Sequence, residues 1–549
     1  MKGKSLKLNF VMNAILTMSS IIFPLITFRY VSNILLPDGT GKVSFAISLI
    51  TYFNTFAQLG IPIYGIRICA MVRDDREQLT RTAHELLAIN LVVGALSYVA
   101  LALAIIFVPR LREDRALYIV VSSMILLSAI GMEWLYKALE QYIYIAVRSI
   151  VFKVIAMVGM FLLIHQKSDY VVYGGITVFA SSAANIINLF HARKYIDFHS
   201  VGYYSIHRHL KPVLIFFAMS CATTIYTNLD NVMLGIMTTK EQVGYYDAAV
   251  KVKVILVSLV TSLGTVLLPR ASYYVEMEMK GEFRRISAKA LNFVMLVALP
   301  LMIFFMLFAE QSIRFLTGGT LYESATLPMQ IIMPTLLFIG ITNVLGIQIL
   351  VPLGREKTVL VSEIVGAVTD LILNAILIPL YGAAGAAIGT LAAEFAVLVV
   401  QYIALRSEVR GAFLDIHYFK IFAALIPAVL SAVWVSHLQI GTFWLLVFAA
   451  ILFFGLYGIV LLLLKEPLVK EIVFGLLSKL KRKNKISNKK LKHRISKQKN
   501  NNKLSTSKYQ KRRNKLRPTN SNRNTNSSKR NNKQQTRKHN IYRRIIIRW

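Results

Sequence analysis

The sequence predicts an all-α polytopic membrane protein with about 14 transmembrane helices. Of its 549 residues, 55% are hydrophobic and only 16% are charged, which is typical of a membrane protein. Apolar stretches of about 18–25 residues, the length of a spanning helix, recur from residue 10 to residue 464. We expect two pseudo-symmetric six-helix bundles, two additional helices and a disordered basic C-terminal tail.

The predicted spans follow one another with short connections. In chain order they cover residues 10–36, 43–66, 84–108, 116–135, 144–164, 170–190, 212–236, 244–268, 289–309, 327–351, 358–378, 384–405, 418–437 and 442–464. No small-x-small cleavage pattern follows the first stretch, so it is interpreted as a helix and not as a signal peptide. The only cysteines, Cys69 and Cys221, predict neither a disulfide framework nor a four-ligand metal site.

The distribution of Lys and Arg predicts the orientation. With the N-terminus in the cytoplasm, the inner connections ahead of the tail carry 23 of these residues and the outer connections carry 7. The exception is an outer loop with Arg110, Arg112 and Arg115. An even number of spans returns the C-terminus to the cytoplasm, so both termini are predicted to be cytoplasmic.

The tail, residues 479–549, contains 27 Lys or Arg and no Asp or Glu. Its polar composition cannot bury enough apolar surface to offset ordering entropy, so it is predicted to be disordered. A polybasic cytoplasmic segment favours anionic membrane lipids as its partner. Nothing in the tail indicates a folded module for specific nucleic-acid binding, and a gene-model artefact is an alternative interpretation.

A weak internal repeat relates the two halves. Gly41 to Ala46 (GKVSFA) resembles Gly244 to Ala249 (GYYDAA), and the pair Leu59-Gly60 corresponds to Leu263-Gly264. Duplicating an even number of spans keeps both halves in the same orientation, with an axis along the membrane normal. The predicted parts are 1–195 and 196–410 for the two bundles, 411–478 for two additional helices and 479–549 for the tail.

Ionisable residues inside the spans favour a transport function. Each costs roughly 2.5–3.5 kcal/mol at a helix centre, so it needs a wet cavity or a partner. A substrate pathway supplies both. The longest connections are only about 20 residues, and no set of catalytic or metal-binding residues is recognisable. A membrane-bound glycosyltransferase or polymerase is therefore the less favoured class, and no enzymatic activity is predicted.

Several long segments resemble the bacterial oligosaccharide flippases of polysaccharide biosynthesis, in the multidrug/oligosaccharidyl-lipid/polysaccharide exporter superfamily. They include FPLITFRYVSNILLPDGTGKVSFAISLITYFNTFAQLGIPIYGIRICAMVRDD (23–75), MEWLYKALEQYIYIAVRSIVFK (132–153), IYTNLDNVMLG (225–235), VGYYDAAVKVKVILVSLVTSLGTVLLPRASYY (243–274) and GIQILVPLGREKTVLVSEIVGAVTDLILNAILIPLYGAAGAAIGTLAAE (346–394). The likeness covers nearly everything before the tail. Relatives often carry Arg where Asn33 stands and Gly where Leu36 stands, so Arg29, one turn earlier, is the expected substitute for that Arg.

The resemblance implies a flippase that moves undecaprenyl-pyrophosphate-linked oligosaccharide units across the bacterial cytoplasmic membrane for surface polysaccharide. It implies no cofactor, leaves H⁺ or Na⁺ coupling open, and suggests a polysaccharide polymerase and assembly proteins as partners. A multidrug or small-solute exporter of the same superfamily is the alternative. Alternating access between two rocking bundles, through a cationic cavity, is the expected mechanism.

Cationic side chains are the candidates for binding a pyrophosphate, because Arg offers bidentate donors and Lys a point charge. They are, with the amide of Asn33, Arg29, Arg67, Arg148, Lys153, Lys251 and Lys253. Each also has a structural interpretation. Arg29 would be a buried partner of Asp230 or another acid, Arg67 a topology determinant, and Arg148 and Lys153 snorkelling side chains.

Acidic and amide residues are the candidates for ion coupling or for polar contacts in the cavity: Asp230, Asp247, Glu363, Asp370, Asn374 and Glu394. Asp247 and Lys251 are four residues apart and can pair on one helix face, which directs Lys253 elsewhere. Asp230 is either an ion site or the partner of a cation. Glu363, Asp370 and Asn374 fall near one helix face, as a cavity stripe or as interhelical hydrogen-bonding groups.

Overall fold

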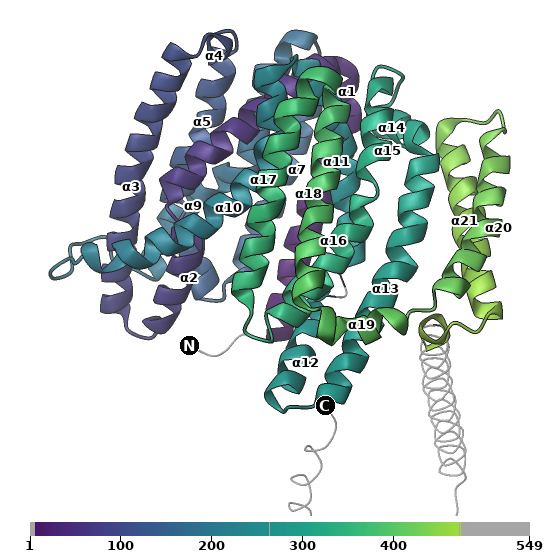
Figure 1. Cartoon of the computed structure of the whole chain (residues 1–549). Helices are drawn as coiled ribbons and strands as arrows, with labels where there is room; N and C mark the ends of the chain where they lie inside the picture. Colours follow the sequence, from purple (N-terminus) through teal and green to yellow (C-terminus); the bar gives the residue numbers. More distant parts are fainter. Residues whose placement is uncertain (1–5, 263, 472, 474–549) are drawn as a thin grey trace, which may run out of the picture. The chain divides into compact units, whose positions relative to one another are not determined.

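The computed structural model describes residues 6–262, 264–471 and 473, and every regular element in these residues is helical (Figure 1). The all-α prediction is therefore confirmed. The predicted tail, residues 479–549, lies outside the described residues, as do residues 1–5. The disorder of the tail and its lipid partners stay predictions.

The N-terminal half consists of long helices joined by short ones. They are α1 (Leu6–Gln58), α2 (Ile61–Met71), α3 (Arg76–Phe107), α4 (Pro109–Arg112), α5 (Arg115–Ile130), α6 (Glu133–Ala138), α7 (Tyr142–Leu163), α8 (Tyr170–Val178) and α9 (Ala184–His191). A π-helical turn, Phe179–Ala183, connects α8 to α9. We call this half the N-lobe.

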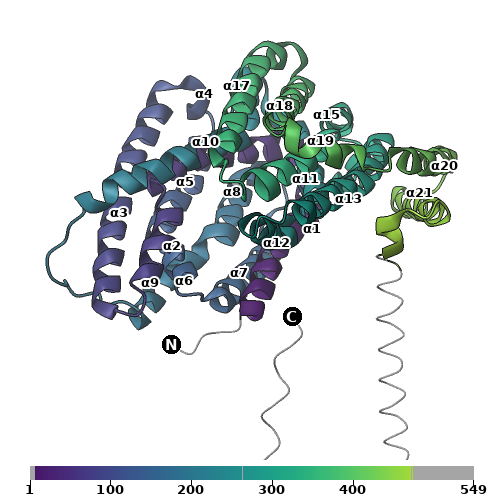
Figure 2. The same cartoon turned by 60° about the horizontal axis from the view of Figure 1, so that its bottom comes forward.

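The C-terminal half has the same character. Its helices are α10 (His207–Met237), α11 (Lys240–Thr261), α12 (Gly264–Glu276), α13 (Lys280–Leu307), α14 (Ala309–Thr317), α15 (Thr326–Ile332), α16 (Thr335–Asn343), α17 (Glu356–Tyr381), α18 (Ala383–Ala404) and α19 (Arg406–Leu414), followed by α20 (Tyr418–Ser436) and α21 (Thr442–Leu463). We call α10 to α18 the C-lobe. The helices α20 and α21 pack against each other beside α13 and α14 (Figures 1 and 2).

Eleven helical runs of the described residues are long and apolar enough to cross a membrane. One of them, Met12–Met71, contains both of the first two predicted spans, and α5 is a shorter apolar helix. Helix α11 lies where the span 244–268 is predicted. The polytopic character is thus confirmed, while the total of fourteen spans stays a prediction.

A sharp break at Leu36 divides α1 into two segments. Leu36 has a φ of 61°, and Pro37 follows it. The residue before a proline is disfavoured in the helical region, whereas a proline is well tolerated at the first position of a helix. The sequence predicts a loop here, but the second helical segment resumes at once. The single element α1 therefore contains the first predicted span and most of the second.

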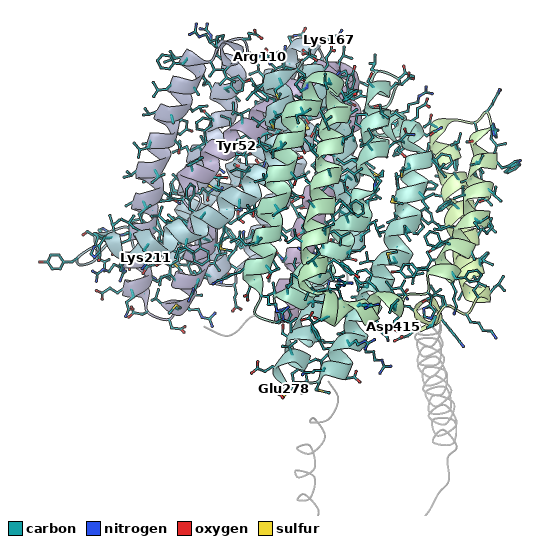
Figure 3. All side chains as sticks on the ribbon, viewed as in Figure 1. Tyr52, Arg110, Lys167, Lys211, Glu278 and Asp415 are labelled. Atoms are coloured by element: carbon teal, nitrogen blue, oxygen red, sulfur yellow. The ribbon has the colours of Figure 1, made fainter. Side chains whose placement is uncertain are left out.

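The two ends of the helical bundle can be recognised by labelled side chains. Figure 3 places Arg110 and Lys167 at one end and Glu278 and Asp415 at the other. The Lys and Arg distribution predicts that the first two face outward and the last two face the cytoplasm. We use the names outer end and inner end in the sense of this prediction.

Two helix ends have the spacing of the predicted repeat. An offset of 203 residues relates Gly41 to Gly244 and the last residue of α1, Gln58, to the last residue of α11, Thr261. Both long helices thus stop at equivalent positions, and a short helix follows each. The duplication itself stays a prediction.

One buried cluster joins the two lobes. It includes Phe28 and Phe45 from α1 and Tyr246 from α11, each no more than 2% exposed. Large apolar side chains elsewhere are exposed, such as Phe419 and Trp444 on α20 and α21, at 81% and 59%. Exposure of this kind fits helices whose surroundings are lipid and whose backbone bonds are satisfied internally.

A buried carboxylate fastens the inner end of α10 to the N-lobe. Glu85 on α3 is 1% exposed, and its Oε2 lies 2.7 Å from Nε2 of His209 and 2.5 Å from Nη2 of Arg208. Its Oε1 accepts a bond of 2.6 Å from the backbone N–H of Ser205. On α2, the hydroxyl of Tyr64 lies 2.8 Å from Nδ1 of His209. Glu85 thus joins α3 to α10, and His209 extends the network to α2.

We predict that Glu85→Ala destabilises the protein strongly. Removing one member of a buried charged network costs about 3 kcal/mol, because the remaining partners stay desolvated. The apparent Tm in detergent, followed by size-exclusion after heating, measures the effect. Glu77→Ala is the matched control, because Glu77 is exposed in the first turn of the same helix. Equal Tm values for the two variants would contradict the assignment.

Candidate functional site

Asp230 is the centre of a buried polar cluster in the C-lobe. It lies on α10, is 8% exposed, and accepts hydrogen bonds from three neighbouring helices. The donors are the Tyr246 hydroxyl of α11, Nδ2 of Asn374 on α17 at 2.7 Å and Oγ1 of Thr390 on α18 at 2.9 Å. Hydrogen bonds of this kind stabilise a carboxylate in an apolar interior. The predicted alternative that Arg29 pairs with Asp230 is not what the structure shows.

Two further acids adjoin this carboxylate. Asp370 on α17 is 2% exposed, one turn before Asn374, and its Oδ1 has no hydrogen-bond partner among the described residues. Glu394 on α18 is 7% exposed, one turn after Thr390. Both interact electrostatically with Asp230. We call Asp230, Asp370, Asn374, Thr390 and Glu394 the carboxylate cluster.

A glycine leaves the room that this cluster occupies. A Cβ at Gly389 of α18 would lie 2.2 Å from Oδ1 of Asn374 and 3.1 Å from Oδ1 of Asp370. Any side chain there would displace the two oxygens. Within the described ranges no group of three or more His, Cys, Asp or Glu side chains has the arrangement of a metal site. The carboxylate cluster consists of three carboxylates, one amide group and one hydroxyl group.

The three residues of the predicted stripe on α17 differ in exposure. Asp370 and Asn374 are buried, but Glu363 is exposed. The buried positions repeat every four residues, through Ser362 and Gly366, which places Glu363 just beside this face. Spacing alone could not resolve that difference of one position.

A second polar region is a cavity in the N-lobe with a volume of about 370 Å³. It lies between α1, α7 and the run from α8 to α9, and it is lined by Arg148, Lys153 and Glu133. The lining side chains that carry a hydroxyl group belong to Ser20, Thr27, Ser149, Tyr173, Thr177 and Ser181. We call it the basic cavity. Its size is in the range of small-molecule sites.

Arg148 and Lys153 of α7 are both held inside this lobe. Arg148 is 8% exposed, with Nη1 donating to the Ala184 carbonyl at 3.2 Å and Nη2 lying 3.8 Å from Oε2 of Glu133. Its Nε has no hydrogen-bond partner among the described residues. Lys153 donates to Oγ of Ser20 at 2.7 Å. A buried Arg148 differs from the snorkelling side chain that its sequence position allowed.

Arg29 and Asn33 make contacts between the lobes. Nη1 of Arg29 donates to the Phe315 carbonyl at 2.9 Å, and Nδ2 of Asn33 donates to the Thr317 carbonyl at 2.6 Å. These carbonyls belong to the last turn of α14, where intrahelical partners are missing. Arg29 also lines an outer cavity of about 390 Å³. In this structure both side chains cap a helix end.

The remaining candidates lie apart from both regions or beside them. Asp247 and Lys251 form the ion pair that their spacing predicts. Lys253, also on α11, is half-buried and interacts electrostatically with Asp370. Arg67 is exposed on α2. The candidate cations therefore do not converge on one point.

Sequence reasoning missed several partners. Tyr246 and Thr390 complete the surroundings of Asp230, and Glu133 neutralises part of the basic cavity. A usable signal existed for Thr390, which precedes Glu394 by one helical turn. No comparable signal marks Tyr246, because its contact depends on how α10 and α11 pack.

Comparison with known proteins agrees with this architecture. The polysaccharide biosynthesis protein family matches residues 6–275, and the MatE family matches residues 216–376. A protein of Escherichia coli (strain K12) named "Putative O-antigen transporter" is 23% identical over 407 residues, which are 74% of this chain and 97% of the relative. Its namesake from Shigella dysenteriae is 23% identical over 391 residues, 69% of this chain and 94% of the relative.

A solved structure shares the fold. The lipid II flippase MurJ, in an inward closed conformation, superposes with a TM-score of 0.63 at 16% identity and covers 84% of this chain and 99% of its own. The two family matches overlap and together extend from residue 6 to residue 376, which is the N-lobe and most of the C-lobe. These matches support an assignment of the chain to the polysaccharide flippase family of the multidrug/oligosaccharidyl-lipid/polysaccharide exporter superfamily.

Proposed function

We propose that this protein translocates undecaprenyl-pyrophosphate-linked oligosaccharide units across the bacterial cytoplasmic membrane for surface polysaccharide. The observation that carries the proposal is the basic cavity, where buried Arg148, half-buried Lys153 and several hydroxyl groups occur together inside membrane-spanning helices. Membrane interiors tolerate such groups when they serve a substrate pathway. Relatives named O-antigen transporters support this substrate class.

The cavity chemistry fits the two polar parts of such a substrate. A pyrophosphate takes charge-assisted hydrogen bonds from Arg148, whose Nε is unpartnered among the described residues, and from Lys153. Sugar hydroxyls are matched by the Ser and Thr side chains of the lining. Since Glu133 neutralises only part of the positive charge, the cavity favours an anion.

The carboxylate cluster supports coupling to H⁺ or Na⁺. Carboxylate, amide and hydroxyl oxygens are the ligands of hard cations. Oδ1 of Asp370 has no hydrogen-bond partner among the described residues, so it is available to bind such a cation. A cation bound in the C-lobe would compensate the mutual repulsion of Asp230, Asp370 and Glu394. Coupling of this kind would drive the cycle of alternating access.

The same cluster favours one rival function. A cation exporter would use the C-lobe acids for its substrate, and it would leave the basic cavity without a role. Labelled lipid-linked oligosaccharide in proteoliposomes separates the two possibilities. Cleavage of the oligosaccharide by an external glycosidase reports flipping. Transport of a cationic dye without any cleavage of the oligosaccharide would contradict our proposal.

We predict that Arg148→Gln combined with Lys153→Gln slows flipping by at least about a hundredfold, because each of the two charge-assisted bonds contributes about 1.5–3 kcal/mol. The glycosidase-exposure rate measures the loss. Lys167→Gln is the control, since Lys167 is exposed near the outer end (Figure 3). A folded double variant that flips at the wild-type rate would refute the role of the cavity.

We also predict that Asp370→Asn abolishes the response of flipping to an imposed ion gradient. The substitution keeps the shape of the side chain but removes the charge that a coupling ion would neutralise. The rate is compared with and without a proton or sodium gradient. Glu356→Gln, an exposed position at the start of the same helix, should respond as wild type does. An unchanged gradient response in Asp370→Asn excludes coupling through this acid.

A further inference from the structure

Two glycines allow the backbones of the two lobes to approach each other closely. A Cβ at Gly41 of α1 would lie 1.7 Å from the carbonyl oxygen of Lys240, and a Cβ at Gly244 of α11 would lie 2.2 Å from the carbonyl oxygen of Pro37. Each partner carbonyl belongs to the residue four positions before the other glycine. We call the contact formed by Pro37, Gly41, Lys240 and Gly244 the glycine seam.

The seam lies on the axis of the internal repeat. The offset of 203 residues that relates Gly41 to Gly244 also relates Pro37 to Lys240, so the two contacts are images of each other. The same offset separates Ser44 from Asp247, and Oγ of Ser44 donates to Oδ2 of Asp247 at 2.8 Å. Reciprocal contacts between equivalent positions are the mark of a two-fold axis. The seam is therefore where the duplicated halves meet.

Only glycine allows this approach. A Cβ at either position would clash with a main-chain oxygen. Because that oxygen belongs to the backbone, a change of side-chain rotamer could not relieve the clash. With hydrogen there instead, Cα–H groups face the carbonyls, as at other close helix crossings. Such contacts are weak, so the surfaces can separate without losing a strong bond between their backbones.

Neighbouring contacts place the seam at the outer end. Oγ1 of Thr40 lies 2.8 Å from the hydroxyl of Tyr322, in the connection between α14 and α15. Nζ of Lys240 lies 3.4 Å from the centre of the Phe45 ring. Thr40 and Phe45 are both 1% exposed. In this structure the outer end is thus closed between the lobes.

We propose that the glycine seam is the outer seal of the transport cycle, and that Gly41 and Gly244 set the balance between closed and open outer ends. The seal excludes solvent when the helices meet at the two glycines and opens when α1 and α11 separate there. The proposal rests on the proposed alternating-access function, in which the outer end closes and opens. Its test needs no substrate, so the two can fail separately.

Accessibility of one cysteine tests the seal. Ala248 of α11, 0% exposed and one turn after Gly244, becomes Cys in a full-length chain whose Cys69 and Cys221 are replaced by Ala. A membrane-impermeant maleimide is added to the outside of cells. Overpacking a close contact shifts a two-state equilibrium by about tenfold, so Gly41→Ala and Gly244→Ala should each speed labelling by about that factor.

The control is Gly159→Ala in α7, where a Cβ would meet nothing within 4 Å. It should label as slowly as the parent chain. Folding is checked by size-exclusion in detergent for every variant. Folded seam variants that label no faster than the control would overturn the proposal. Labelling that rises only for reagent on the inner side would overturn the assignment of the seal to the outer end.

A second variant keeps the proposal testable if the alanine variants do not fold. Ser44→Cys with Asp247→Cys places two thiols at equivalent, contacting positions. Oxidation should crosslink them and trap the closed outer end, which lowers the maleimide labelling of the Ala248→Cys reporter to background. Reduction should restore it. No crosslink under oxidation, in a folded protein, would show that the two helices do not meet there and would overturn the proposal.

Discussion

A charge inside a bilayer must be given partners, and this requirement organises the structure. Asp230 receives three hydrogen bonds from three helices, and Glu85 holds α10 to α2 and α3. Arg148 is bonded to a carbonyl and lies near one acid. Each buried ionisable group thus fixes the packing of helices far apart in sequence. Removing the charges would leave apolar helices with little to determine their mutual register.

The two lobes share the spacing of several residues but differ in their chemistry. Helices α1 and α11 stop at equivalent residues and meet at equivalent glycines. The polar groups that each lobe encloses are nevertheless opposite in charge: cations dominate the basic cavity of the N-lobe, and acids dominate the C-lobe cluster. Ser44 opposite Asp247 is a small example, since two carboxylates at that contact would repel each other.

Sequence reasoning recovered the helical class and the likeness to the flippase family, because apolar length and long ordered likeness are properties of the chain itself. It placed the i, i+4 pair of Asp247 and Lys251 correctly. It did not foresee that Arg29 caps α14, or that Tyr246 reaches Asp230, because these contacts depend on tertiary packing. The break at Leu36 was expected as a loop, although Pro37 marked its position. Periodicity likewise could not separate exposed Glu363 from buried Asp370.

The opposite charges of the two lobes have a consequence for energetics across the membrane. In the proposed cycle the anionic headgroup and the coupling cation occupy separate sites and move in one conformational change. The membrane voltage acts on the algebraic sum of the charges that cross, at about 2.3 kcal/mol per charge for each 100 mV. A cation that enters through the C-lobe while a phosphate leaves through the N-lobe moves charge in the same electrical sense, so an inside-negative voltage favours both movements. Stoichiometry, rather than affinity, then sets how much charge one cycle moves.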